Sequence, residues 1–353
     1  MPPAPSPLAL SVGCPSGIGP EIAVRAAALY RRPLVLVGDR RQLLGLARAR
    51  GVELAPDAIV QPGPALAAAD RRPGRPSPAG GAAQLAWVDA ALDLVRSGRA
   101  RALVTGPVSK AAIAASGAPG AAAFRGHTEH LRDRSGAREV VMAFWSPRLV
   151  TSLVTTHLPL ARVPRAVRPE GVASAAFWLA WLLGRLRPQK DALVAVAALN
   201  PHAGEGGLLG DEEATRIAPA LALAERRAAA AGLRARFVGP VGAETAFRRA
   251  REGRFGGVVA MYHDQATIAL KLTSFGDAVN VSLGLPFVRT SVDHGTGYDI
   301  AGRGEADPSA LVAALRLADR LEPAAAPRDR AVRGAPVAGA PRARKSTKKA
   351  VLA

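Results

Sequence analysis

The stretch 260–304 carries polar and charged side chains at wide spacings between apolar runs. An imidazole, an ammonium, an amide and a guanidinium stand there, on His263, Lys271, Asn280 and Arg289. Groups of these types need hydrogen-bond partners or counter-charges when they are buried. If they converge from successive strand ends, they are suited to hold an anionic ligand beside a metal ion. A chance scatter over surface turns is the alternative that this stretch alone leaves open.

Three histidines each stand where an apolar, strand-like run ends. They are His157 after 149–155, His202 after 192–199, and His263 after 258–261. A single histidine of this kind is more often a capping or core residue. Three of the chain's six histidines at equivalent strand ends favour a three-histidine metal site with open positions, which is typical of a catalytic metal. The spacings carry no local metal signature, so this hypothesis rests on placement.

Two other segments offer groups for an anion. His127 and Thr128 stand where a loop enters a helix, and Thr128 can cap that helix or offer a backbone N–H to an anion. Lys110 follows the apolar strand 102–104, and α/β sheets bind ligands at such strand ends. A surface lysine on the next helix is an equally good interpretation of Lys110.

Apolar strands and helices with 3.6-residue periodicity alternate along the chain and must position these residues. Strands are expected at 8–12, 34–37, 102–104, 192–199, 234–238 and 258–261, with a hairpin over 139–155. Helices are expected at 20–29, 41–50, 82–95, 171–186, 211–231, 244–251 and 309–320. The segment 61–81 is rich in Pro and Gly and is expected to be a long loop. This order predicts an α/β fold, and 353 residues are enough for two domains.

Composition narrows the class of protein. The formal net charge of +19 raises nucleic acid as a partner, but aromatic residues make up 4% of the chain, too few for base-stacking platforms. The apolar run 172–183 is too short to cross a membrane, and the N-terminus has no secretory pattern. Cys14 is the single cysteine, which excludes an intrachain disulfide and fits a cytoplasmic protein. A small-molecule enzyme without nucleic-acid or membrane partners is expected.

Several blocks in one order resemble the 4-hydroxythreonine-4-phosphate dehydrogenase family of vitamin B6 biosynthesis. They are GIGPE at 17–21, TGPVSK at 105–110, GHTEHL at 126–131, TTHLPL at 155–160, NPHAGEGG at 200–207, and the run from MYHDQ at 261 to AGRG at 304. The resemblance covers roughly residues 8 to 320. The first loop departs from the usual family pattern, because it reads Gly-Cys-Pro-Ser-Gly instead of an acidic residue followed by Pro-Ala-Gly.

The resemblance implies a role for each matching residue. His157, His202 and His263 match the family's ligands of a divalent metal, Zn²⁺, Mg²⁺ or Co²⁺. The family's substrate-binding positions match a second set: His127, Thr128, Lys271, Asn280 and Arg289. The residues that bind NAD(P)+ are left unassigned.

The resemblance also implies an architecture similar to isocitrate and isopropylmalate dehydrogenases. Two α/β/α subdomains flank a cleft, the first formed by 1–125 with 290–322 and the second by 126–289. The basic tail 323–353 is expected to be disordered. The family is homodimeric with its active site at the subunit interface, which implies that the third histidine, His263, comes from the neighbouring subunit.

The implied reaction is NAD(P)+-dependent oxidation of the secondary alcohol of 4-phosphooxy-L-threonine. The resulting 3-keto acid loses carbon dioxide to give 3-amino-2-oxopropyl phosphate. Lys271 and Asp264 are the candidates for the base that removes the alcohol proton. Related dehydrogenases of 4-phospho-erythronate or 4-phospho-threonate are the nearest alternative. A metal-dependent hydrolase that uses Glu205 or Asp293 as its base is a more distant one.

Overall fold

The computed structural model describes residues 6–274 and 276–321, so the predicted tail lies outside the described residues. Eleven strands of this part form one sheet in the order β3-β2-β1-β4-β11-β10-β5-β6-β9-β7-β8. The strands are β1 (Leu8–Ser11), β2 (Leu34–Val37), β3 (Ile59–Val60), β4 (Leu103–Thr105), β5 (Val141–Trp145), β6 (Val150–Leu153), β7 (Ala192–Ala197), β8 (Ala235–Val241), β9 (Gly257–Ala260), β10 (Val279–Leu283) and β11 (Arg289–Val292).

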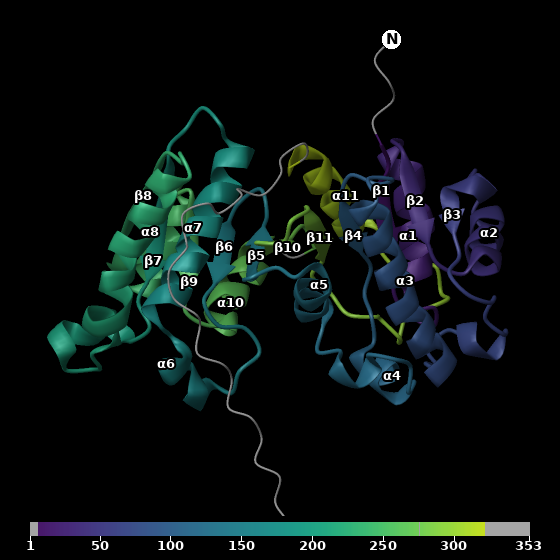
Figure 1. The fold of residues 1–353 in the computed structure, drawn as a ribbon, viewed down its shortest axis with the longest axis horizontal. Helices are drawn as coiled ribbons and strands as arrows, with labels where there is room; N and C mark the ends of the chain where they lie inside the picture. Colours follow the sequence, from purple (N-terminus) through teal and green to yellow (C-terminus); the bar gives the residue numbers. More distant parts are fainter. Residues whose placement is uncertain (1–5, 275, 322–353) are drawn as a thin grey trace, which may run out of the picture.

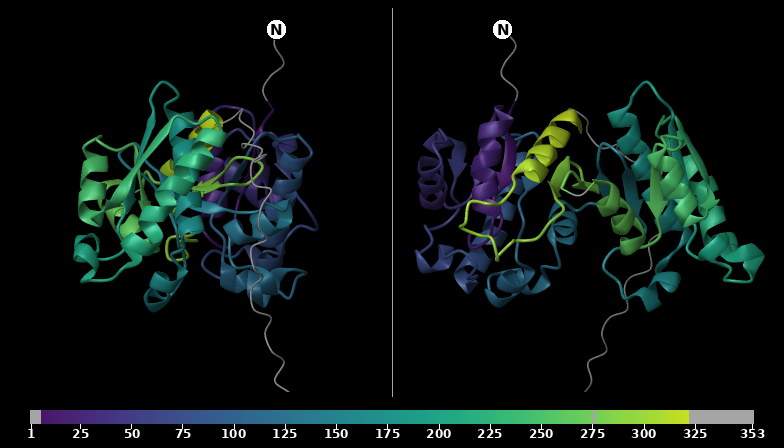
Figure 2. Two further views of the ribbon diagram at one scale, coloured as in Figure 1. Left: turned by 60° about the vertical axis from the view of Figure 1, so that its left-hand side comes forward. Right: turned by 180° about the vertical axis from the view of Figure 1, so that it is seen from behind.

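Helices cover both faces of this sheet in two lobes (Figure 1). In the first lobe, β1 to β4 and β11 lie with α1 (Gly19–Tyr30), α2 (Arg40–Ala49), α3 (Pro78–Arg96), α4 (Lys110–Ala115), α5 (His127–Ser135) and α11 (Ser309–Leu321). In the second, β5 to β9 lie with α6 (Val163–Ala166), α7 (Pro169–Leu186), α8 (Ala218–Ala230), α9 (Ala243–Arg251) and α10 (His263–Ser274). The view from behind in Figure 2 shows the same division. The predicted α/β class with two halves is confirmed.

The direction of the strands changes between the lobes. β1, β2, β4 and β11 run parallel, whereas β10 is antiparallel to both β11 and β5, and β5 is antiparallel to β6. The strands β6, β9, β7 and β8 are again mutually parallel. Each adjacent pair of strands twists by about 20–25°. This twist accumulates across the sheet, so the carboxyl ends of β4 and of β6 and β9 can face one space although the strands run oppositely.

The core of the second lobe is centred on α7, in which every residue from Val172 to Leu183 is buried. Apolar residues surround this part of the helix, a pattern that is typical of a buried helix. Trp178 and Trp181 pack edge to face on it, with ring centroids 5.7 Å apart. The sheet and its neighbouring helices therefore form a fixed frame for the strand ends that carry the histidines.

Two predicted segments differ from the structure. The expected loop 61–81 ends early, because Ser77 accepts a hydrogen bond from the backbone N–H of Gly80 and α3 begins at Pro78. The helix expected over 211–231 is instead a π-helical turn, η6 (Glu213–Ile217), followed by α8. Within the described ranges, no helix is both long and apolar enough to span a bilayer.

Candidate active site

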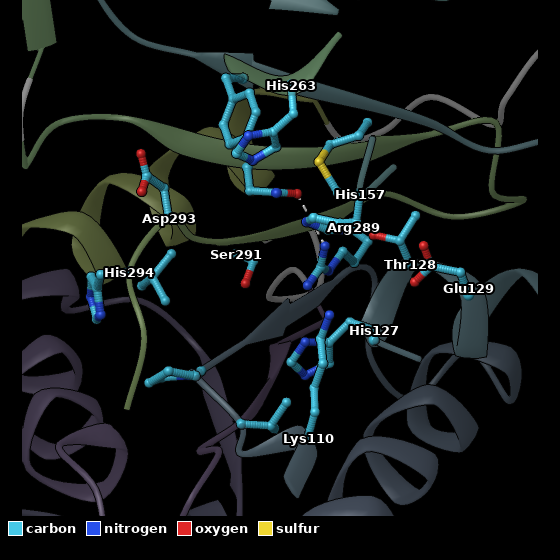
Figure 3. Close-up of a pocket in the computed structure, with 18 residues that line it drawn as sticks. Lys110, His127, Thr128, Glu129, His157, His263, Arg289, Ser291, Asp293 and His294 are labelled. Atoms are coloured by element: carbon cyan, nitrogen blue, oxygen red, sulfur yellow. Dashed lines mark hydrogen bonds between the residues drawn. The ribbon is translucent and has the colours of Figure 1, made fainter. Parts of the chain in front are cut away.

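A cavity of about 270 Å³ lies where the two lobes meet (Figure 3). The segment after β4 and the start of α5 line it from one lobe, and the ends of β6 and β9 line it from the other. Strands β5, β10 and β11 contribute Met142, Phe144, Asn280, Arg289, Ser291 and Val292. Most of the predicted site residues therefore converge, and they do so in a pocket of a size that suits a small ligand.

Arg289 is the most deeply buried cation of this pocket, with 2% of its surface exposed. Its guanidinium donates to Asn280 Oδ1 at 3.2 Å and Ser282 Oγ at 3.0 Å from Nη1, and to Thr105 Oγ1 at 2.6 Å from Nη2. All three partners are neutral. Burial lowers the pKa of Arg289 to about 9, and the charge of Glu129 offsets this only in part. A negative ligand would supply the counter-charge that these partners lack.

Arg289 retains donors for such a ligand. A guanidinium has five N–H groups, and the three hydrogen bonds above leave Nε–H and one N–H on Nη2. Nε is buried and has no partner among the described residues. Because Nε and Nη2 share one edge of the guanidinium, they can hold two oxygens of a carboxylate or phosphate.

His127 and Thr128 form the first turn of α5, and both line the cavity. The Nε2 atom of His127 is buried without a partner in the described part of the chain. Burial, followed by the charges of Arg289, His130 and Lys110, holds the pKa of His127 well below its ordinary value. This imidazole is therefore neutral at physiological pH and can donate or accept one hydrogen bond. The backbone N–H groups of the same turn favour an anion.

His157 and His263 come together in one chain, with ring centroids 5.4 Å apart. They follow β6 and β9, which are parallel neighbours. Burial, then the charges of Lys110 and His263, lowers the pKa of His157, which favours the neutral form that binds metals. His263 Nδ1 lies 2.6 Å from Asp264 Oδ1, so its Nε2 remains for a metal. A carboxylate on the far nitrogen commonly orients a metal-binding histidine.

His202 does not join this pair. It follows β7, but its side chain does not line the cavity, and the residue is exposed. Among residues 6–274 and 276–321, no three His, Cys, Asp or Glu side chains gather closely enough to hold a metal ion. The described part of one chain thus brings two of the three predicted ligands together. The pair consists of His157 and His263, and His202 lies apart from it. The resemblance had implied a different division, in which His263 is supplied by the neighbouring subunit.

Lys271 lies beside the cavity and not inside it. It is on α10, which corrects the expectation that it follows a strand, and it lines an adjoining space with His263, Asp264 and Asp293. Its Nζ atom is 3.9 Å from Asp293 Oδ1. Burial raises the pKa of Asp293, and the charges of Lys271, His294 and His263 counter this in part. Asn280 likewise lies within β10 and not at a strand end.

Sequence reasoning did not assign the hydroxyl groups around Arg289 or the carboxylate of Glu129, and it named Asp293 only as a possible base of a hydrolase. Thr105, Ser282 and Ser291 are ordinary strand residues in the sequence, so no signal marked them. Glu129 lines the cavity one residue after Thr128. Asp293 and His294 directly follow β11, and their place at a strand end could have identified them as pocket residues.

The fold and the cavity define an α/β enzyme of small anionic ligands, with paired imidazoles beside a buried guanidinium. The family model described as pyridoxal phosphate biosynthetic protein PdxA matches residues 32–318. The chain belongs to this family.

Curated relatives match nearly the whole chain. The 4-hydroxythreonine-4-phosphate dehydrogenase of Aromatoleum aromaticum is 44% identical over 331 residues, which are 89% of this chain and 96% of that protein. The enzyme of the same name from Desulfosudis oleivorans is 41% identical over 332 residues, with the same coverage.

Solved structures agree with this relationship. The 4-hydroxythreonine-4-phosphate dehydrogenase of Klebsiella pneumoniae has a TM-score of 0.74 at 32% identity, covering 90% of this chain and 99% of that one. A terephthalate 1,2-cis-dihydrodiol dehydrogenase from Burkholderia xenovorans has a TM-score of 0.63 at 34% identity, covering 88% and 97%. Both of these proteins are named as dehydrogenases, which favours a dehydrogenase over the hydrolase that the sequence analysis left open.

Proposed function

We propose that this chain is an NAD(P)+-dependent dehydrogenase of 4-phosphooxy-L-threonine in pyridoxal 5'-phosphate biosynthesis. The observation that carries this proposal is the buried Arg289, which lines the cavity together with His127 and Thr128 and whose Nε has no partner among the described residues. The substrate has a carboxylate at one end and a phosphate at the other. Two separate groups of anion donors match a ligand with two anionic ends.

Each end of the ligand has a set of donors in this proposal. Arg289 would bind one anionic group through Nε and Nη2, while Asn280 and Ser282 hold the guanidinium in place. The first turn of α5, with His127 and Thr128, would bind the other group through backbone N–H donors. With both anionic ends of the substrate bound, its secondary alcohol, which lies between them, would be held beside His157 and His263. Positioning of this kind lowers the barrier of the step that follows.

His157 and His263 suit two coordination positions of a divalent cation. His157 and His263 are adjacent, His157 favours the neutral form, and Asp264 leaves Nε2 of His263 available. When bound, Zn²⁺, Mg²⁺ or Co²⁺ would supply Lewis-acid chemistry and NAD(P)+ would accept a hydride. Met142 and Phe144 give this cavity an apolar wall.

Lys271 is the better candidate for the base. Asp264 Oδ1 is 2.6 Å from His263 Nδ1, whereas Lys271 Nζ makes only a longer contact of 3.9 Å with Asp293. Because Asp293 lines both the cavity and the adjoining space that holds Lys271, the ammonium group can approach the alcohol from that side. Loss of the alcohol proton to Lys271, with hydride transfer to NAD(P)+, leaves a 3-keto acid. Release of its carboxylate as carbon dioxide leaves the electron pair of the broken C–C bond as an enolate, which takes up at carbon the proton held by Lys271 and gives 3-amino-2-oxopropyl phosphate. Arg289 and Asn280 would hold the charged groups through both stages.

The two sugar-acid alternatives have the same two anionic ends as 4-phosphooxy-L-threonine but carry a hydroxyl in place of its amino group, so an assay must distinguish the substrates. 4-Phospho-erythronate and 4-phospho-threonate retain the phosphate, whereas a carboxylated cis-dihydrodiol of the kind named for the Burkholderia xenovorans protein has none. Formation of NAD(P)H, followed at its near-ultraviolet absorbance, would be compared across the four substrates. The proposal expects the highest kcat/KM with 4-phosphooxy-L-threonine. A preference for any other substrate would reassign the function within the family.

We further propose that two copies of the chain complete each metal site. One copy cannot bring His202 to the pair in the described structure. Exposed large apolar side chains flank all three histidine segments, as a partner surface would require. They are Leu158 and Leu160 after His157, Leu208 and Leu209 after His202, and Ile268 and Leu272 on the helix of His263.

Mixed dimers test which histidine crosses the interface. If His202 comes from the partner, a dimer of His157→Ala with His202→Ala has one intact site, by two-fold symmetry. Its activity should reach about half that of wild type. A dimer of His157→Ala with His263→Ala should stay inactive, because each of its two sites then carries one of the two lesions. Activity in the mixture of His157→Ala with His263→Ala, and none in the mixture of His157→Ala with His202→Ala, would show that His263 is the histidine supplied by the partner.

A further inference from the structure

His202 belongs to a turn with an unusual backbone. Residues 202–206 all have positive φ, with values of 52°, 55°, 84°, 45° and 68°. Three of them are not glycine: His202, Ala203 and Glu205. Residues with a Cβ are strained in this left-handed region, and a series of them persists only where the surroundings enforce it. The structure must therefore contain a group that holds the turn.

The carboxylate of Glu213 is that group. Its Oε1 accepts the backbone N–H groups of Leu199 and Asn200, both at 2.8 Å, and its Oε2 accepts from Asn200 Nδ2 at 3.0 Å. Glu213 is 5% exposed. A Cβ on Gly204 would approach Oε2 to 2.9 Å, so the turn lies directly against the carboxylate.

The backbone around Glu213 is also unusual. Glu213 opens the π-helical turn η6, a form that is rare and often found at functional sites. Arg216 of the same turn donates to the carbonyl groups of Pro164 and, at 3.3 Å, Val167, in the segment that follows His157. This short turn is thus bonded to the residues just before His202 and to the segment that follows His157.

We propose that Glu213 is the positioning residue of the metal ligand His202, acting through the left-handed turn 202–206. This inference rests on the proposed metal site. The carboxylate anchors the residues before Pro201 and packs against Gly204, so the imidazole of His202 is presented to solvent in one direction. Without this anchor the strained residues would relax to negative φ and the imidazole would point elsewhere.

Binding of Co²⁺ alone, followed by its visible absorption in the full-length protein, measures the effect. Glu213→Ala should weaken Co²⁺ binding by about 10- to 100-fold, as loss of an outer-shell partner usually does. Glu213→Asp keeps the carboxylate and should lose less. The control Glu225→Gln, an exposed glutamate on α8, should match wild type. Amide hydrogen exchange should accelerate within 199–208 and stay unchanged elsewhere.

A second-site variant separates this role from general stabilisation. Ala203→Gly removes the strain of one left-handed residue, so in the Glu213→Ala background it should recover about fivefold in Co²⁺ affinity. If Glu213→Ala does not fold, Glu213→Gln replaces it, and the inference requires that Glu213→Gln lose affinity while Glu225→Gln does not. If the Glu213 variant binds Co²⁺ as tightly as wild type while His202→Ala binds it weakly, the positioning role of Glu213 is overturned and the metal site stands. Wild-type affinity in both would overturn it together with the metal site.

Discussion

Replacement of Arg289 by lysine is the sharpest test of the anion site. The lysine keeps one positive charge in the same buried position, so electrostatic attraction to the ligand persists. It loses the planar fork, because an ammonium has no pair of parallel N–H groups. It also leaves some of Asn280, Ser282 and Thr105 without their present donor.

The size of the loss follows from the free donors of Arg289. Two N–H groups remain for the ligand, and a hydrogen bond to a charged group contributes about 1.5–3 kcal/mol. A lysine that keeps one of the two contacts should lose about 1.5–3 kcal/mol of transition-state binding. This corresponds to a decrease of about 10- to 200-fold in kcat/KM. Arg289→Met loses both contacts and the charge, and should lose at least about 1,000-fold.

Initial rates of NAD(P)H formation with 4-phosphooxy-L-threonine would give kcat/KM for wild type and both variants. Arg316→Lys, at an exposed position on α11, is the matched control and should be unaffected. Thermal unfolding of each variant would show that the fold is retained. An Arg289→Lys enzyme with the kcat/KM of wild type would refute the assignment and make Arg289 a structural residue of the sheet.

Two other outcomes are expected. Because burial holds the pKa of His127 below 6.5, the unfolded chain binds a proton there that the fold does not, so stability is lost as pH falls below that value. In His127→Gln, the unfolding free energy should decrease less steeply between pH 6.5 and 5 than in wild type, by up to about 1.4 kcal/mol per pH unit. If the two proteins show the same dependence of unfolding free energy on pH, His127 is not the group that titrates. Asp264→Asn should weaken Co²⁺ binding by about 10- to 100-fold, measured by visible titration, because His263 loses the carboxylate on Nδ1. If Asp264→Asn binds Co²⁺ with the affinity of wild type, Asp264 does not orient His263 for metal binding.

Much of the frame could be predicted from the sequence because its signals are local. The strands β1, β2 and β9 are short apolar runs bounded by breakers, and their predicted limits agree within one residue. Parallel strands deliver their following residues to one edge, so three histidines at strand ends predicted one shared site, and the structure brings two of them together, those after β6 and β9.

The support of Arg289 could not be predicted, because it depends on register. Thr105 on β4 lies opposite Ser291 on β11, and Ser282 on β10 lies opposite Arg289 on β11. A shift of one residue in either pairing would direct these hydroxyl groups to the other face of the sheet. Periodicity in the sequence identifies a strand, but it does not identify the neighbour or the register.

The three histidines illustrate the same limit. Each follows one of three adjacent parallel strands, β6, β9 and β7, so the strand-end rule treats them as equivalent. The turn after β7 makes His202 different, because its backbone is left-handed, and we propose that Glu213, eleven residues further along the chain, holds it. A site that needs three imidazoles then has two in one chain and a third presented outward. Under our proposal the partner's surface, and not a motion within one chain, unites them.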